Sequence, residues 1–174
     1  MLAKARETLV SVMTRPAGSL MYVQDTYANL PSIVQDKKID FILLDIGVNM
    51  EHFKDGTRGF SVHEDAPLDM RFDTREGQTA ADIVNTADKQ TLMHMFVQYG
   101  DFAPKSAEYF TDNMIEARKK EPILTTKQLI DFFYGIGVRK NQLPVIFQCL
   151  RIQTNQELEQ LETFLKVFPD CLAS

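Results

Sequence analysis

The stretch IDFILLDIG, Ile39 to Gly47, decides the fold that this sequence predicts. Its apolar residues follow one another without polar alternation, which is typical of a strand that helices cover on both faces, as in a parallel sheet. Before it, SLMYVQD (19–25) has the pattern of a short strand, NLPSIVQDKK (29–38) that of a crossover, and residues 1–12 that of a helix. The order helix, strand, crossover, strand predicts a doubly wound α/β unit.

From residue 79 onward the patterns are those of helices. Thr79, with Asp82 three residues later, marks one helix start, and Thr125 with Gln128 forms a capping-box pattern at another. The last helix is predicted within NQELEQLETFLKVF (155–168), where one apolar stripe comprises Leu158, Leu161, Leu165 and Phe168. We expect this stripe to pack against the sheet or against a partner. The fold is therefore expected to be α/β but helix-dominated overall, with a compact helical subdomain.

Composition limits the classes of function. With 174 residues, 44% of them hydrophobic, the chain is large enough to bury a core. Its formal net charge of -5 excludes an overall basic field, and the short basic runs 118–120 and 139–140 are typical of solvated helix ends. Cys149 and Cys171 lack CxxC spacing and predict buried free thiols, as in a reducing cytoplasm. Since we find no leader-like segment and no apolar run of membrane-spanning length, we expect a cytoplasmic protein.

Few residues have the spacing of a chemical site. Asp45 closes the predicted buried strand, where open α/β sheets bind ligands, so it is either a ligand contact or a loop-capping aspartate. His52, His63 and His94 fall in different segments without HxxxH or HExxH spacing, so no metal site is expected. The absence of a GxSxG elbow leaves nucleophilic catalysis without support.

Three short motifs occur in one order: RGFS (58–61), PLDMR (67–71) and TAA (79–81). Together with FILLDIG (41–47) they resemble the bacterial 16S ribosomal RNA (cytosine-N4)-methyltransferases, the MraW/RsmH family, in which LLDLGVSS leads into RGFSF, GPLDMRMD and a G-x-(S/T)-AA helix start. VQDTYANL resembles that family's VHGNFADL, and IEARKKEPILTTKQL and FQCLRIQTNQELEQLE resemble its IVEARKKxPIxTTxEL and FQALRIAVNxELExLE. The resemblance covers nearly the whole chain.

The resemblance implies transfer of a methyl group from S-adenosylmethionine to the N4 amine of a cytidine in small-subunit ribosomal RNA. That amine is a poor nucleophile, so catalysis would depend on holding it in line with the methyl group, with the base flipped or unpaired. By resemblance, Tyr27 lies against the cofactor's adenine, Asp45 orients the cofactor or the amine as the catalytic residue, and His52 is a further cofactor contact. Two interpretations remain for Arg58, Asp69 and Arg71. These residues either bind the substrate or pair with one another and so brace the loop.

The resemblance also implies a division of the chain. Residues 1–75 would be a partial Rossmann-like methyltransferase core with its connecting loop, 76–148 an inserted helical subdomain that helps to recognise RNA, and 149–174 a returning core helix. The family's GGGGHS-like cofactor turn precedes the matched part, and its GGR and SFHSLEDR motifs follow it. The family's basic stretch after YGEE is DFAPKSAEYF here, and the arginine of HPATRTFQ aligns with Val145. Positive charge is lost where RNA is expected.

Two strands alone make a marginal sheet with exposed edges, so we expect self-association as a homodimer. Three functional hypotheses remain open. In the first, the chain is an enzyme that is weak or inactive alone, because its cofactor turn comes from a neighbouring chain or a separate polypeptide. In the second, it is a catalytically silent, self-associating helical module that binds RNA or protein. In the third, it is a homo-oligomer that binds no ancestral ligand.

Overall fold

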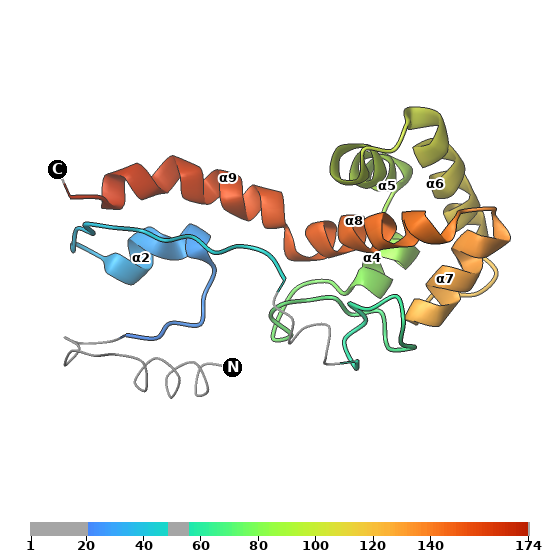
Figure 1. Ribbon diagram of the computed structural model, residues 1–174, viewed down its shortest axis with the longest axis horizontal. Helices are drawn as coiled ribbons and strands as arrows, with labels where there is room; N and C mark the ends of the chain where they lie inside the picture. The colour runs from blue at the N-terminus through green and yellow to red at the C-terminus, as the bar shows by residue number, and fades with distance from the viewer. Residues whose placement is uncertain (1–20, 49–55, 174) are drawn as a thin grey trace. The chain divides into compact units, whose positions relative to one another are not determined.

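The computed structural model describes residues 21–48 and 56–173. Chain contacts divide the protein into a terminal unit (Met1–Leu44 with Glu159–Ser174) and a central unit (Asp45–Leu158). Within the described residues the helical elements are η1 (Tyr27–Asn29), α2 (Leu30–Val34), α4 (Ala80–Thr86), α5 (Lys89–His94), the π-helix η2 (Met95–Tyr99), α6 (Pro104–Arg118), α7 (Thr126–Gly135), η3 (Lys140–Gln142), α8 (Leu143–Asn155), α9 (Glu157–Val167) and η4 (Phe168–Cys171) (Figure 1). The helix expected over residues 1–12 lies outside the described residues.

Local capping explains where two helices of the central unit begin. The Thr79 hydroxyl accepts a hydrogen bond from the Asp82 N–H (3.0 Å), and the Asp82 carboxylate accepts one from the Thr79 N–H (2.9 Å). Thr125 and Gln128 exchange the same pair of bonds at the start of α7. Each reciprocal pair satisfies two backbone donors that a helix start leaves free. Both predicted helix starts are confirmed.

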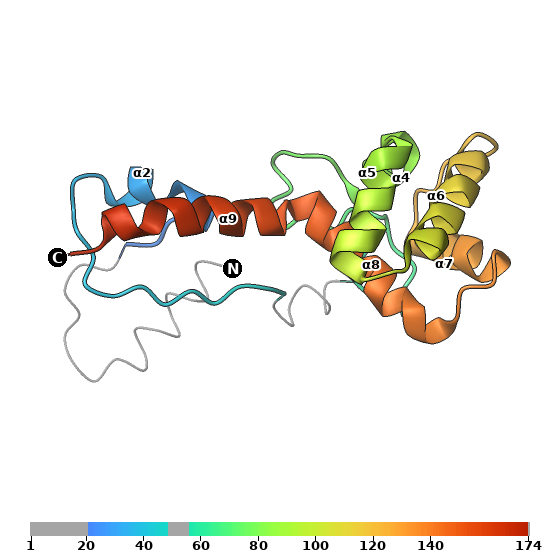
Figure 2. The ribbon, with the colours of Figure 1, turned by 90° about the horizontal axis from the view of Figure 1, so that it is seen from above.

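An aromatic cluster lies at the centre of the helical core. Phe96 of η2 meets Phe110 of α6 edge-to-face with ring centroids 5.7 Å apart, and Phe133 of α7 meets both rings in the same manner. Edge-to-face pairs add about 0.5–1.5 kcal/mol to the burial of each ring. In Figure 2 the orange α8 runs along the group formed by α4 to α7. The predicted helix dominance is confirmed, and the compact helical group lies in the central unit.

The prediction of a strand at Ile39–Gly47 is wrong, because these residues form no strand in the structure. Only Ile39 pairs, in a parallel bridge with Leu172, through hydrogen bonds of 2.9 Å from the Ile39 N–H to Cys171 O and from the Ala173 N–H to Ile39 O. Phe41 and Leu43 are 76% and 82% exposed. An apolar run becomes a strand only where a neighbouring backbone pairs with it, and the described residues offer this run one bridge. Residues 21–25 are likewise not in a strand, so the Rossmann-like core stays a prediction.

The terminal unit is held together by its own aromatic contacts. The Tyr27 ring meets Phe164 of α9 edge-to-face at 5.6 Å, and Phe164 stacks on Phe168 at 5.3 Å. Both views show α2 beside α9. Of the predicted stripe, Phe168 packs on the buried Phe164, whereas Leu158 and Leu165 are 47% and 53% exposed.

Cys149 and Cys171 are both buried free thiols, as predicted. Burial raises the pKa of the Cys149 thiol to about 12, because the thiolate loses its hydration. Of the helices in the described ranges, none is both long enough and apolar enough to cross a membrane. The predicted boundaries at residues 75/76 and 148/149 stay predictions.

Candidate functional site

The segment from Arg58 to Asp73, called here the 58–73 loop, is anchored to the start of α7. The Leu68 N–H donates to Leu124 O and the Thr126 N–H to Ala66 O, both at 2.9 Å. The Thr126 hydroxyl also links the two segments, because it accepts from the Ala66 N–H (3.0 Å) and donates to Glu64 O (2.6 Å). The loop also buries apolar side chains in the helical core; they are Phe60, Leu68 and Met70.

The loop crosses itself tightly at Gly59. Gly59 has a φ of +73°, and a Cβ atom there would lie 2.4 Å from Pro67 O, so only glycine fits. The Met70 N–H donates to Arg58 O at 2.9 Å across this crossing. Met70 is fully buried with a φ of +59°, a left-handed backbone conformation that residues other than glycine rarely adopt. The loop is therefore held in a conformation that its own sequence does not favour.

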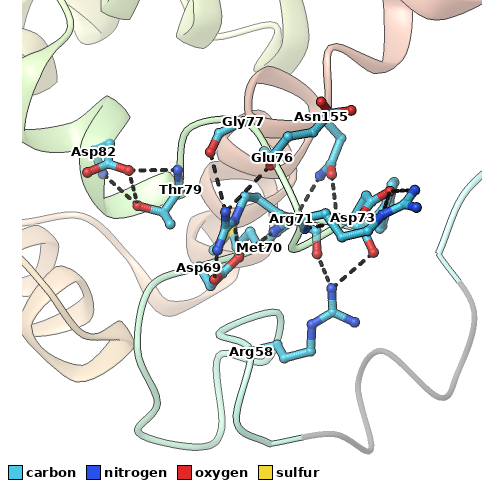
Figure 3. Close-up of polar contacts among 12 residues, drawn as sticks. Arg58, Asp69, Met70, Arg71, Asp73, Glu76, Gly77, Thr79, Asp82 and Asn155 are labelled. Atoms are coloured by element: carbon cyan, nitrogen blue, oxygen red, sulfur yellow. Dashed lines mark hydrogen bonds and ion pairs between the residues drawn. The ribbon is translucent and has the colours of Figure 1, made fainter. Parts of the chain in front are cut away.

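The side chain of Arg58 braces the loop by binding backbone carbonyl groups of the loop. One terminal nitrogen of its guanidinium donates to the carbonyl oxygens of Arg71 and Phe72 (3.2 Å to the latter). The guanidinium lies 5.5 Å from the centre of the Phe60 ring, which stacks on the Phe72 ring at 5.8 Å. Figure 3 shows the Arg58 side chain reaching both carbonyl groups. Arg58 thus fixes two consecutive peptides of the loop.

Asp69 and Arg71 form a bidentate ion pair. The Arg71 Nε donates to Asp69 Oδ1 (2.9 Å) and the Arg71 Nη2 to Asp69 Oδ2 (2.8 Å), while the Arg71 Nη1 lies 3.5 and 3.4 Å from the carbonyl oxygens of Glu76 and Gly77 (Figure 3). The side chains of Arg71 and Asp69 are 20% and 22% exposed. The side-chain hydrogen bond from Arg71 lowers the pKa of Asp69, and the same bond raises the pKa of Arg71. The pair therefore stays charged.

Two interpretations of Arg58, Asp69 and Arg71 were open from the sequence. The contacts that brace the loop are present, and the three residues lie in one loop. Their role in substrate binding stays a prediction. Sequence reasoning missed a fourth residue of this network. Asn155, the last residue of α8, binds the loop at Met70 and Phe72. It stands in the FQCLRIQTNQELEQLE stretch, but an asparagine at a helix end also suits a turn, so the pattern alone did not mark it.

A cavity of about 370 Å³ lies between the loop and α8. Phe60 and Met70 of the loop and Phe147 of α8 give it an apolar lining, with Arg151 and His63 among its polar lining residues. Arg151 is paired with Glu157, at 2.7 Å from Nε to Oε1. An apolar cavity of this size with a few polar groups is typical of small-ligand sites. Among the residues that the structure describes, no group of three His, Cys, Asp or Glu side chains is placed to hold a metal ion.

The structure describes two of the three residues predicted to bind the cofactor, and these two belong to different units. Tyr27 belongs to the terminal unit, where its half-buried ring packs on Phe164, and Asp45 is an exposed residue of the central unit. His52 lies outside the described residues. An aromatic ring suits an adenine, and a carboxylate suits hydroxyl and ammonium groups, so the two described side chains fit S-adenosylmethionine by chemical type.

Comparisons with known proteins agree with the sequence motifs of this site. The family model described as "MraW methylase family" matches residues 1–174. Proteins named ribosomal RNA small subunit methyltransferase H are similar to the chain. The one from Desulforapulum autotrophicum is 37% identical over 158 residues, which is 85% of this chain and 50% of that protein. The one from Bacteroides thetaiotaomicron is 37% identical over 139 residues (78% and 45%), and the one from Elusimicrobium minutum is 35% identical over 162 residues (89% and 55%).

The chain spans about half the length of the curated relatives that it matches. The match of the family model extends over the motifs of the 58–73 loop, the start of α4 and the end of α8. The chain belongs to the MraW methylase family.

Proposed function

We propose that this chain takes part in the transfer of a methyl group from S-adenosylmethionine to the N4 amine of a cytidine in small-subunit ribosomal RNA. The observation that carries this proposal is the 58–73 loop. It contains two of the motifs that resemble the methyltransferases, and it is held in one conformation by hydrogen bonds from Arg58, Arg71 and Asn155. A rigid loop suits this chemistry because a weak nucleophile must be held in line with the methyl group.

The cofactor is assigned to Tyr27, Asp45 and His52. The Tyr27 ring would cover the adenine, and the Asp45 carboxylate would accept hydrogen bonds from the cofactor or from the cytidine amine. S-adenosylmethionine supplies the methyl group as an electrophile. Asp45 is then the catalytic residue, because an acceptor for the amine protons increases electron density on the attacking nitrogen as the new bond forms.

Substrate contact is assigned to Arg58, Asp69 and Arg71. One terminal nitrogen of Arg58 donates to two loop carbonyl groups, and Arg71 donates to both carboxylate oxygens of Asp69. Their contribution to RNA binding therefore comes from the part of the Asp69–Arg71 pair that remains exposed, about a fifth of each side chain. Residues 76–148, which include α4 to α7, are proposed as the inserted subdomain that recognises RNA.

Calorimetric titration of the chain with S-adenosylmethionine tests the cofactor assignment. We expect binding in the micromolar range that Asp45→Ala abolishes, with Asp40→Ala as a control that removes a nearby carboxylate. If millimolar ligand produces no heat with the unaltered chain, the cofactor assignment is wrong.

Product analysis tests the reaction itself. Small ribosomal subunits from a strain that lacks its own enzyme for this modification would be incubated with the chain and S-adenosylmethionine. The nucleosides would then be analysed by mass spectrometry. We expect a low yield of N4-methylcytidine with the unaltered chain, which is expected to be weak alone, and none with Asp45→Ala. Unmodified RNA in both reactions, despite bound cofactor, would contradict the assigned activity.

The second candidate function is a catalytically silent, self-associating helical module. The observation that favours it is the exposure of Phe41 and Leu43 on an extended segment of the terminal unit, because exposed apolar residues next to a free backbone edge promote pairing between chains. Light scattering at micromolar concentration distinguishes the states. A homodimer that Leu43→Asp converts to a monomer supports self-association, and a monomer at all concentrations contradicts it.

A further inference from the structure

The side-chain amide of Asn155 uses all its hydrogen-bonding groups at the boundary between α8 and the 58–73 loop. Its Nδ2 donates to Arg151 O in its own helix (2.9 Å) and to Met70 O (2.8 Å), and its Oδ1 accepts from the Phe72 N–H (2.6 Å). Because both N–H groups and the oxygen are engaged, the orientation of the amide is fixed. Asn155 therefore joins the end of a helix to a loop 83 to 85 residues earlier in the chain.

The two loop groups that Asn155 binds flank Arg71. One is the carbonyl of Met70, the residue in the left-handed conformation, and the other is the N–H of Phe72. In Figure 3 Asn155 approaches this short segment from the side opposite Arg58. A left-handed residue other than glycine persists only where its surroundings hold it. The contacts on either side of Arg71 fix the direction in which its side chain leaves the backbone toward Asp69.

We propose that Asn155 is a positioning residue. Its amide holds Met70 to Phe72 in place, and so it directs the Asp69–Arg71 ion pair toward RNA. The direction toward RNA depends on the function proposed above, whereas the hold on the loop does not. Asn155 itself takes no part in the reaction, because its amide groups are all engaged within the protein.

Asn85 provides a matched control, because its amide makes the same set of bonds elsewhere. Its Nδ2 donates to Ala81 O in its own helix and to Ile123 O (both 2.8 Å), and its Oδ1 accepts from the Ile123 N–H (3.0 Å). Asn85→Ala and Asn155→Ala therefore remove equal numbers of bonds of the same kind. Only the second variant releases the segment next to Arg71.

Amide hydrogen exchange, followed residue by residue by NMR, tests the hold on the loop independently of function. The unaltered chain, Asn155→Ala and Asn85→Ala would be compared well below the melting temperature of each. We expect Asn155→Ala to speed exchange at the Phe72 N–H at least about tenfold, because that group loses its acceptor. Asn85→Ala should do so at Ile123 and leave Phe72 unchanged. Slow exchange at Phe72 in Asn155→Ala would overturn the proposal.

Asn155→Asp separates the two loop contacts. The carboxylate keeps an acceptor for the Phe72 N–H but loses the donor to Met70 O and places negative charge beside that carbonyl. We expect exchange at Phe72 to stay near that of the unaltered chain while exchange at the Met70 N–H rises. Protection of Phe72 as poor as in Asn155→Ala would show that the Oδ1 contact does not hold the loop.

RNA affinity at the same temperature tests the direction of the ion pair, with a cytidine-containing single-stranded RNA oligonucleotide as the probe. We expect Asn155→Ala to weaken binding about fivefold and Asn85→Ala to weaken it less, because the Asn85 amide contacts Ala81 and Ile123 and not the segment next to Arg71. Equal losses in both variants would reduce Asn155 to a stabilising residue and overturn its positioning role. If the unaltered chain does not bind the oligonucleotide, the proposed RNA function fails, and the exchange at Phe72 still decides whether Asn155 holds the loop.

Discussion

The guanidinium of Arg71 contacts both carboxylate oxygens of Asp69, at 2.9 Å from Nε and 2.8 Å from Nη2. The same arginine also approaches two carbonyl oxygens that precede the Thr79 cap of α4. A single side chain thus connects the 58–73 loop to the turn before α4.

This pair makes stability depend on pH. The pKa of Asp69 is lowered in the folded state, chiefly by the hydrogen bond from Arg71. Its contribution to the free energy of unfolding is present above the unfolded pKa, about 3.9, and is lost as the pH falls through the lower folded value. We expect Asp69→Asn to cost about 1 kcal/mol at pH 7 and little at pH ~2. Urea unfolding at both pH values measures this, with Asp36→Asn as a control at an exposed aspartate. An equal cost of Asp69→Asn at both values would contradict the assigned pair.

Gly59→Ala should destabilise the protein by about 2–4 kcal/mol, because its Cβ would meet Pro67 O at 2.4 Å and its φ is +73°. Gly77→Ala is the control, since Gly77 has a φ of +85° with no atom within 4 Å of the Cβ position. It should cost about 1 kcal/mol from backbone strain alone. Chemical denaturation of both variants isolates the close approach at Pro67, and equal losses would show that the crossing relaxes.

Thr126→Val should cost about 2–3 kcal/mol in the free energy of unfolding. The hydroxyl of this fully buried residue accepts from the Ala66 N–H and donates to Glu64 O, and valine leaves both groups without a partner. Thr111→Val is the matched control, because within the described part of the chain the buried Thr111 hydroxyl has no hydrogen-bond partner. That change should be neutral or slightly stabilising. A similar loss in both variants would contradict the assigned bonds.

Cys149 should be inert toward a thiol reagent until the protein unfolds. Burial raises its pKa to about 12, so at pH ~8 almost no thiolate is present, and the reagent has no access to the sulfur. In a Cys171→Ser background, titration with an aromatic disulfide should detect no thiol in the native protein and one thiol in denaturant. Rapid reaction of the native protein would place Cys149 at the surface.

Local signals in the sequence predicted local structure well. The capping pairs Thr79–Asp82 and Thr125–Gln128 lie three residues apart, so the sequence contains both partners within one turn. The strand at Ile39–Gly47 was predicted wrongly because a strand depends on a neighbour that its own residues do not specify. The described residues provide this segment with a single bridge, at Ile39.

The candidate site was predictable only in part, for the same physical reason. The pairing of Asp69 with Arg71 was one of two interpretations open from the sequence, since the residues are close along the chain. The contact of Asn155 with Phe72 spans 83 residues and has no periodicity or motif that marks it. The left-handed conformation of Met70 was equally hidden, because methionine rarely adopts it and only the surrounding contacts hold it there.

The long reach of the Asn155 contacts also determines when the 58–73 loop is able to form during synthesis. A chain leaves the ribosome from its N-terminus, so Met70 emerges well before the residue that holds it. Contacts between residues far apart in sequence form late, after local helices. The loop therefore acquires its final conformation only when translation has passed Asn155, and this makes it a marker of the completed central unit rather than a nucleus for its folding.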